Sequence, residues 1–85
     1  MEEKMENTKE IKLNDFYQAV ILKTLGFPLL RLERGQGKFV TFIFDDPDFK
    51  AEAIIQQYWD RQVTVVARDL IESINELKTR IHTGV

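Results

Sequence analysis

The segment Leu29-Leu-Arg-Leu-Glu-Arg-Gly-Gln-Gly-Lys-Phe-Val-Thr-Phe-Ile-Phe44 decides the fold of this 85-residue chain. Two strand-like runs, 29–33 and 39–44, flank the glycine-rich connection 34–38, which is typical of an antiparallel hairpin. Side chains alternate between the two faces of a strand. Both faces of the second run are therefore substantially apolar, and we expect one to pack on helices and the other to be covered by a helix, a partner or a ligand. One face carries Val40, Phe42 and Phe44, and the other carries Phe39, Thr41 and Ile43.

A first helix is predicted before the hairpin, over residues 15–25. Asn14 is a suitable N-terminal cap, because its side-chain oxygen can accept a free backbone N–H. Gly26 is expected in the left-handed position after the helix, and Pro28 prevents the helix from continuing.

A second helix is predicted to begin at Asp46 and Pro47 and to end near Trp59. Residues 62–66 are a candidate third strand, and residues 67–82 form a cleanly amphipathic last helix. The expected order is therefore α-β-β-α-(β)-α, an antiparallel hairpin packed on helices in the α+β class. The second helix should bury Phe49, Ala53, Ile54 and Tyr58, and the last should bury Leu70, Ile71, Ile74, Leu77 and Ile81.

Composition and charge limit the class of protein. With 44% hydrophobic residues and no cysteine, the chain can form one core but no disulfide framework, thiolate zinc site or cysteine nucleophile. Residues 1–11 are predicted to be a flexible acidic tail, and residues 12–85 a single α+β domain. Residues 1–10 carry a net charge of −2 and the remainder is neutral. The charged N-terminus has no apolar signal region and no run approaches a membrane span, so we expect a cytoplasmic protein.

The residue types that catalysis needs are not arranged for it. The single histidine, His82, lies near the C-terminus, where no partner positions it as a general base. Asp45, Asp46 and Asp48 resemble hard-cation ligands, but helix capping accounts for two of them. We therefore predict that the protein is not an enzyme and that it uses no metal and no cofactor.

Nucleic-acid binding is one of two functional hypotheses. It rests on the basic and aromatic residues Arg31, Arg34, Lys38 and Phe39, joined by Arg61 if the 62–66 strand pairs with the hairpin. Residues 34–42 also resemble the third-strand signature of RNA-recognition-motif domains, in which bases stack on alternating aromatics. Gln36 stands where that signature has an aromatic, and the predicted order begins with a helix rather than a strand. The neutral domain favours a solvated hairpin instead.

Protein–protein contact is the other hypothesis, and the one that we favour. The two-sided strand and the Tyr58-Trp59 pair indicate a small non-enzymatic accessory protein that binds a protein partner or a second copy, as in a homodimer. Its candidate interface residues are Phe39, Thr41, Ile43 and Trp59. Trp59 is the aromatic of the pair that we expect to be exposed.

The order of motifs over about residues 13–81 is similar to a known family. Leu25-Gly26-Phe27, Phe42-Ile-Phe-Asp-Asp-Pro47, Tyr58-Trp59 and Glu76-Leu-Lys78 together resemble the domain-of-unknown-function 5659 family of short prokaryotic and phage-associated proteins. The resemblance implies a phage or mobile-element context. It supplies no activity and no catalytic residue.

Overall fold

The computed structural model describes residues 9–37 and 39–83. They form a sheet of three antiparallel strands and three helices, which confirms the α+β class. The observed order is β-α-β-β-α-α. The elements are β1 (Glu10–Leu13), α1 (Phe16–Thr24), β2 (Leu29–Arg34), β3 (Val40–Asp45), α2 (Ala51–Trp59) and α3 (Ala67–Thr83).

The predicted hairpin is present, with its second strand at the centre of the sheet. The strand order is β1-β3-β2, and β3 is antiparallel to both of its neighbours. Strands β1 and β2 are therefore parallel to each other and are joined across β3 by α1, which is a split β-α-β arrangement.

Strand β1 corrects the sequence prediction. The predicted tail, residues 1–11, overlaps this strand at Glu10 and Ile11, and residues 1–8 lie outside the described residues. Ile11 pairs with Phe44 and Leu13 pairs with Phe42, so the apolar residues of β1 join the face that carries the core. The third strand of the sheet is thus at the N-terminal end of the domain.

Helix α1 matches its prediction to within one residue at each end, but its cap differs. Asp15 Oδ1, not Asn14, accepts the free N–H groups of Tyr17 and Gln18, at 2.9 and 3.0 Å. Asn14 Oδ1 instead accepts a hydrogen bond from Thr41 Oγ1 at 2.7 Å. Gly26 has φ +96°, which confirms the predicted left-handed end of the helix.

Helix α2 begins at Ala51 rather than at Pro47, because a turn intervenes. Asp46 still caps it: the buried Asp46 Oδ1 accepts hydrogen bonds from the backbone N–H groups of Lys50 (2.8 Å) and Ala51 (3.2 Å). The turn places Phe49 at φ +57° and leaves its ring 59% exposed, so the prediction that Phe49 is buried is wrong. Ala53 is exposed as well, whereas Ile54 and Tyr58 are half-buried.

The predicted strand over residues 62–66 is not formed. This segment is an irregular connection between α2 and α3. Helix α3 is confirmed and ends one residue later than predicted, at Thr83. Its buried residues include Leu77, but Ile71 is 54% exposed, contrary to prediction.

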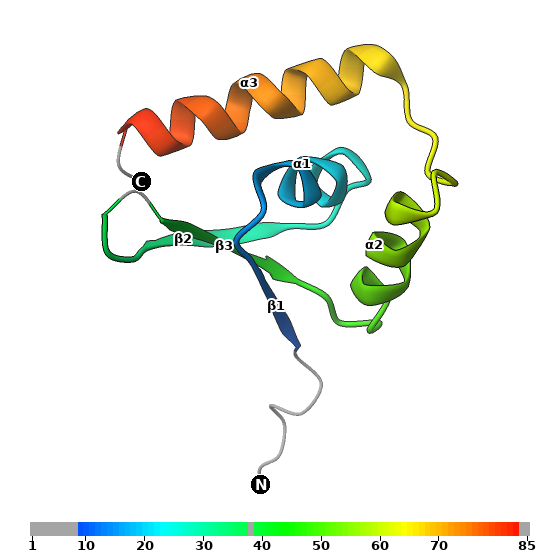
Figure 1. The fold of residues 1–85 in the computed structure, drawn as a ribbon, viewed down its shortest axis with the longest axis horizontal. Coiled ribbons are helices and arrows are strands. Elements are labelled where there is room, and N and C mark those ends of the chain that lie inside the picture. Colours follow the sequence, from blue (N-terminus) through cyan, green and yellow to red (C-terminus); the bar gives the residue numbers. More distant parts are fainter. Residues whose placement is uncertain (1–8, 38, 84–85) are drawn as a thin grey trace, which may run out of the picture.

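Helix α1 is the central helix of the fold (Figure 1). Figure 1 shows α1 between the sheet and α3, with α2 at one end of the molecule. No helix of the described residues is long and apolar enough to cross a membrane. The buried core is formed by Leu13, Ala19, Val20, Leu22, Val40, Phe42, Phe44, Ala51 and Leu77.

Candidate functional site

The sheet face opposite the core is covered by an ion-pair network of the chain itself. Arg31 on β2 reaches across β3 to Glu10 on β1, with two hydrogen bonds of 2.9 and 3.1 Å between guanidinium and carboxylate. A third bond of 3.1 Å joins Arg31 Nε to Glu33. Ile43 on β3 pairs with Arg31 on one side and Lys12 on the other, and it is 0% exposed. Ile43 is therefore not available to a partner in this structure, and the candidate interface is corrected at this residue.

The hydrogen bonds of this network favour the charged forms of Glu10 and Arg31. The hydrogen bond from Arg31 lowers the pKa of the Glu10 carboxyl below its ordinary value. The bonds to Glu10 and then to Glu33 raise the pKa of Arg31 further. Three of the five N–H donors of the Arg31 guanidinium are thus already bonded to carboxylates, which leaves fewer of them for a phosphate group.

The same face lacks the features of an RNA-binding sheet. The N-terminal strand that was missing from the predicted order is present, so that objection to the resemblance does not hold. However, the register places no aromatic side chain of the three strands on this face. Its charged residues are three acids and two bases, for a net charge of −1. They are Glu10, Glu33 and Asp45 against Lys12 and Arg31.

The predicted basic residues are not brought together. Arg34 Nη2 donates to the carbonyl oxygen of Ile81 in α3, so Arg34 lies on the core side of the sheet and Arg31 on the other. Arg61 follows α2, and Figure 1 shows α2 at the end of the molecule away from the β2–β3 turn. Lys38 lies outside the described residues. Phe39, which is 72% exposed, is the aromatic at the tip of the hairpin.

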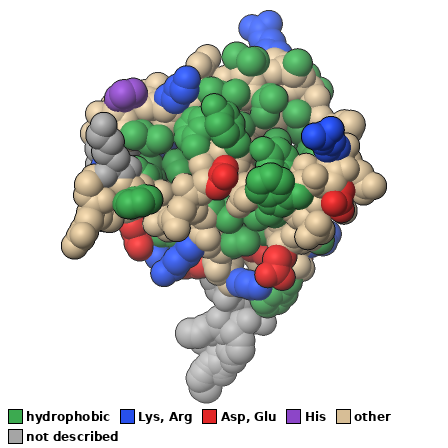
Figure 2. Space-filling view, viewed as in Figure 1, with side chains coloured by type: hydrophobic (Ala, Val, Ile, Leu, Met, Phe, Trp, Pro, Cys, Tyr) green, Lys and Arg blue, Asp and Glu red, His purple; other side chains and the backbone are tan. Residues whose placement is uncertain are grey.

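Hydrophobic side chains gather instead over the helices. Figure 2 shows them in the middle of the face where α1 lies between α3 and α2. Trp59 at the end of α2 is 62% exposed, and its ring meets that of half-buried Tyr58 edge to face, with 5.4 Å between the centroids. The sequence reasoning anticipated the exposure of Trp59. It did not single out the exposed Tyr17 of α1 or Val66 before α3, since exposure on a helix depends on which neighbours pack against it.

Both ends of α2 carry a strained residue that is not glycine. Phe49 and Arg61 have φ values of +57° and +64°, in the left-handed region that disfavours side chains. Arg61 N–H donates to the carbonyl of Tyr58 at 3.1 Å, and Gln62 N–H to that of Gln57 at 2.8 Å, which closes the helix. The ammonium of Lys9 lies 5.0 Å from the centroid of the Phe49 ring, a cation–π contact.

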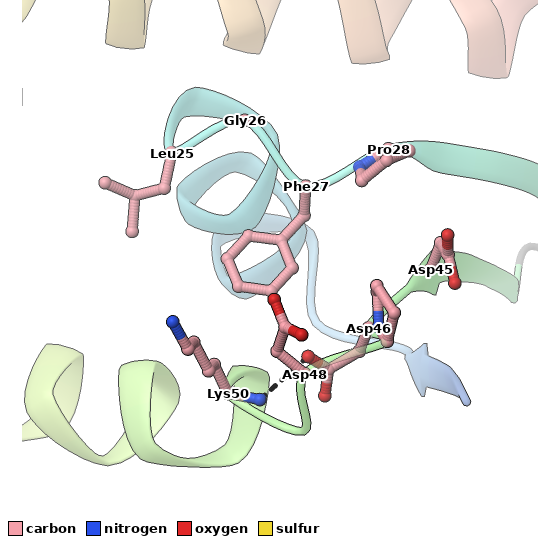
Figure 3. Close-up of a pocket in the computed structure, with 9 residues that line it drawn as sticks. Leu25, Gly26, Phe27, Pro28, Asp45, Asp46, Asp48 and Lys50 are labelled. Atoms are coloured by element: carbon pink, nitrogen blue, oxygen red, sulfur yellow. Dashed lines mark hydrogen bonds between the residues drawn. The ribbon is translucent and has the colours of Figure 1, made fainter. Parts of the chain in front are cut away.

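A small pocket lies between the end of α1 and the segment that leads into α2 (Figure 3). Its volume is about 210 Å³, and Figure 3 shows Leu25 and Phe27 on one side with Asp48 and Lys50 on the other. Asp45 Oδ1 is buried and accepts no hydrogen bond from the described residues. The described residues hold no group of three or more acidic, histidine or cysteine side chains that could bind a metal ion.

Comparison with known proteins identifies the family. Residues 8–83 match the model described as Domain of unknown function (DUF5659). The chain belongs to the DUF5659 family. The match extends from just before β1 to the end of α3, so the whole observed fold is the family's unit, and the resemblance noted from the sequence is confirmed. Neither the curated proteins nor the solved structures gave a match.

Proposed function

We propose that this DUF5659 protein is a non-enzymatic accessory protein of the cytoplasm that binds another protein through its helical side. Trp59 is the anchor of the proposed contact. A phage or mobile-element role belongs to the same proposal and rests on the resemblance alone.

One observation carries the proposal: four of the nine aromatic side chains are more than half exposed. They are Tyr17, Phe39, Phe49 and Trp59. Large aromatic side chains in water are enriched at protein interfaces, where tryptophan and tyrosine are frequent energetic anchors. Burying one of them contributes on the order of 2 kcal/mol to binding.

Photo-crosslinking in the cells that make this protein tests the proposal. A benzophenone side chain replaces Trp59, and a control variant carries it at Gln57, which is exposed on the opposite side of α2. We expect a protein adduct from position 59 and none from position 57. An adduct to nucleic acid, or no adduct from position 59, would refute the proposal.

Nucleic-acid binding is the alternative function, and a direct binding assay distinguishes it from the proposal. The proposal predicts no binding of a labelled duplex or single strand by fluorescence anisotropy, even at low salt. Salt-sensitive binding that disappears in the double variant Arg34→Ala, Lys38→Ala would replace the proposal with the nucleic-acid hypothesis.

A further inference from the structure

We propose that the protein also associates with itself head to tail, with Phe39 of one copy inserted into the pocket between α1 and α2 of the next. This inference deepens the proposed role in protein contacts by naming one partner, a second copy of the chain. It uses a different surface from the contact proposed for Trp59.

The pocket has the size and lining to accept a phenyl ring. Its volume is about 210 Å³, and an apolar cavity of about 150 Å³ already accepts benzene in another protein. Leu25, Phe27, Pro28 and Pro47 supply apolar walls. Three aspartates and one lysine complete the lining, for a net formal charge of −2. The pocket thus favours an apolar group that arrives with a positive charge beside it.

The hairpin tip carries such a group. Phe39 is 72% exposed, the largest exposure of any large hydrophobic residue among those described. Its backbone is fixed in the turn, because Gly35 N–H donates to the Phe39 carbonyl (2.9 Å) and Phe39 N–H donates to that of Gln36 (3.3 Å). Arg34 at the end of β2 places a cation near the same tip, where its Nη2 also donates to the Ile81 carbonyl of α3, and the described tip residues include no acid.

The tip and the pocket cannot meet within one chain. Strand β3 separates them, since Phe39 directly precedes it and the pocket residue Asp45 ends it. Six residues of extended strand span about 20 Å. The contact must therefore form between copies, and it is heterologous: each copy offers a tip at one end and a pocket at the other. Such contacts build rings or open chains rather than closed symmetric dimers.

Sedimentation velocity and light scattering of the full chain, at rising concentration, test the inference. We expect a mass that rises above the 10.0 kDa of one chain. Phe39→Ala removes the inserted ring, and Leu25→Arg places a charge and added bulk in the pocket wall. Each variant alone should remain monomeric. Tyr17→Ala, which removes an aromatic that is 60% exposed elsewhere, should associate like the wild type.

Mixing the two defective variants distinguishes the proposed head-to-tail contact from non-specific association. Phe39→Ala still offers a pocket and Leu25→Arg still offers a ring, so the mixture should form pairs of one copy each and grow no further. A monomeric wild type, association of either variant alone, or no pairing in the mixture would overturn the inference. Circular dichroism serves to check that both variants, altered at exposed residues, remain folded. The crosslinking at position 59 does not depend on Phe39, so the two proposals fail separately.

Discussion

Replacing Asp46 with alanine should destabilise the protein more than any other single change in the segment between β3 and α2. Asp46 is 2% exposed, and its carboxylate accepts the backbone N–H groups of Lys50 and Ala51. Hydrogen bonds to a charged group contribute about 1.5–3 kcal/mol each, and removal of an N-terminal cap typically costs about 0.5–2 kcal/mol. Because Ala51 is 0% exposed, water cannot readily replace the lost acceptor.

We therefore expect Asp46→Ala to lower the free energy of unfolding by about 2–3 kcal/mol, a large part of the total for a domain of this size. For a domain of this size the loss corresponds to a decrease in Tm of about 10–20 °C. Urea and thermal unfolding followed by circular dichroism measure both quantities. Asp46→Asn keeps an acceptor oxygen without the charge and should lose about half as much.

Asp48→Ala is the matched control, because Asp48 is an exposed aspartate two residues further along. It should change the free energy of unfolding by less than about 0.5 kcal/mol. If Asp46→Ala unfolds at the same urea concentration as Asp48→Ala, the assignment of Asp46 as the cap of α2 is incorrect.

Three further predictions concern other parts of the fold. Arg61→Gly should stabilise the protein by about 0.5–1 kcal/mol in urea unfolding, because glycine adopts the left-handed φ of +64° without strain; a destabilised variant would contradict this view of the end of α2. Leu77→Ala should lower the free energy of unfolding by about 2–5 kcal/mol, since Leu77 is 0% exposed. Ile71→Ala, on the exposed side of α3, should lower it by well under half as much. Equal losses in urea unfolding would show that α3 packs differently. Glu10→Gln should be less stable than the wild type at neutral pH, because the bond from Arg31 lowers the pKa of Glu10 in the folded state. A lowered folded-state pKa contributes stability above the unfolded pKa and loses it as pH falls through the folded value, so the two urea curves should converge at strongly acidic pH; a difference independent of pH would exclude the ion pair as its source.

The sequence was sufficient to predict elements whose signals are local. The turn between β2 and β3, the left-handed Gly26 and the amphipathic α3 each depend on residues within a few positions, and each was found where predicted. The start of α2 was misplaced although Asp46 was correctly identified as a cap. Its side chain acts on N–H groups four and five residues later, across a turn, and no spacing rule for a helix N-terminus anticipates that reach.

The sequence predicted a strand at residues 62–66 and none at residues 10–13, whereas the structure has the reverse. The reason for this error is not local. Residues 62–66 have the β-branched composition of a strand but pair with none. Strand β1 has only two alternating apolar residues, Ile11 and Leu13, and owes its strand structure to pairing with Phe44 and Phe42. Which segment pairs with β3 is decided by tertiary contacts, so strand propensity alone selects the wrong one.

The presence of β1 also changes whether the outer face of the hairpin can bind a partner. Without β1, Ile43 is an apolar residue on an open face and Arg31 a free cation, which together indicate a binding surface. With β1 in place, Glu10 binds Arg31, and Ile43, which lies between the two outer strands, is fully buried. The charged and apolar residues on the outside of the sheet therefore stabilise the fold. The aromatic residues that remain exposed lie elsewhere, at the hairpin tip and around the helices, and these are the surfaces on which a search for partners should begin.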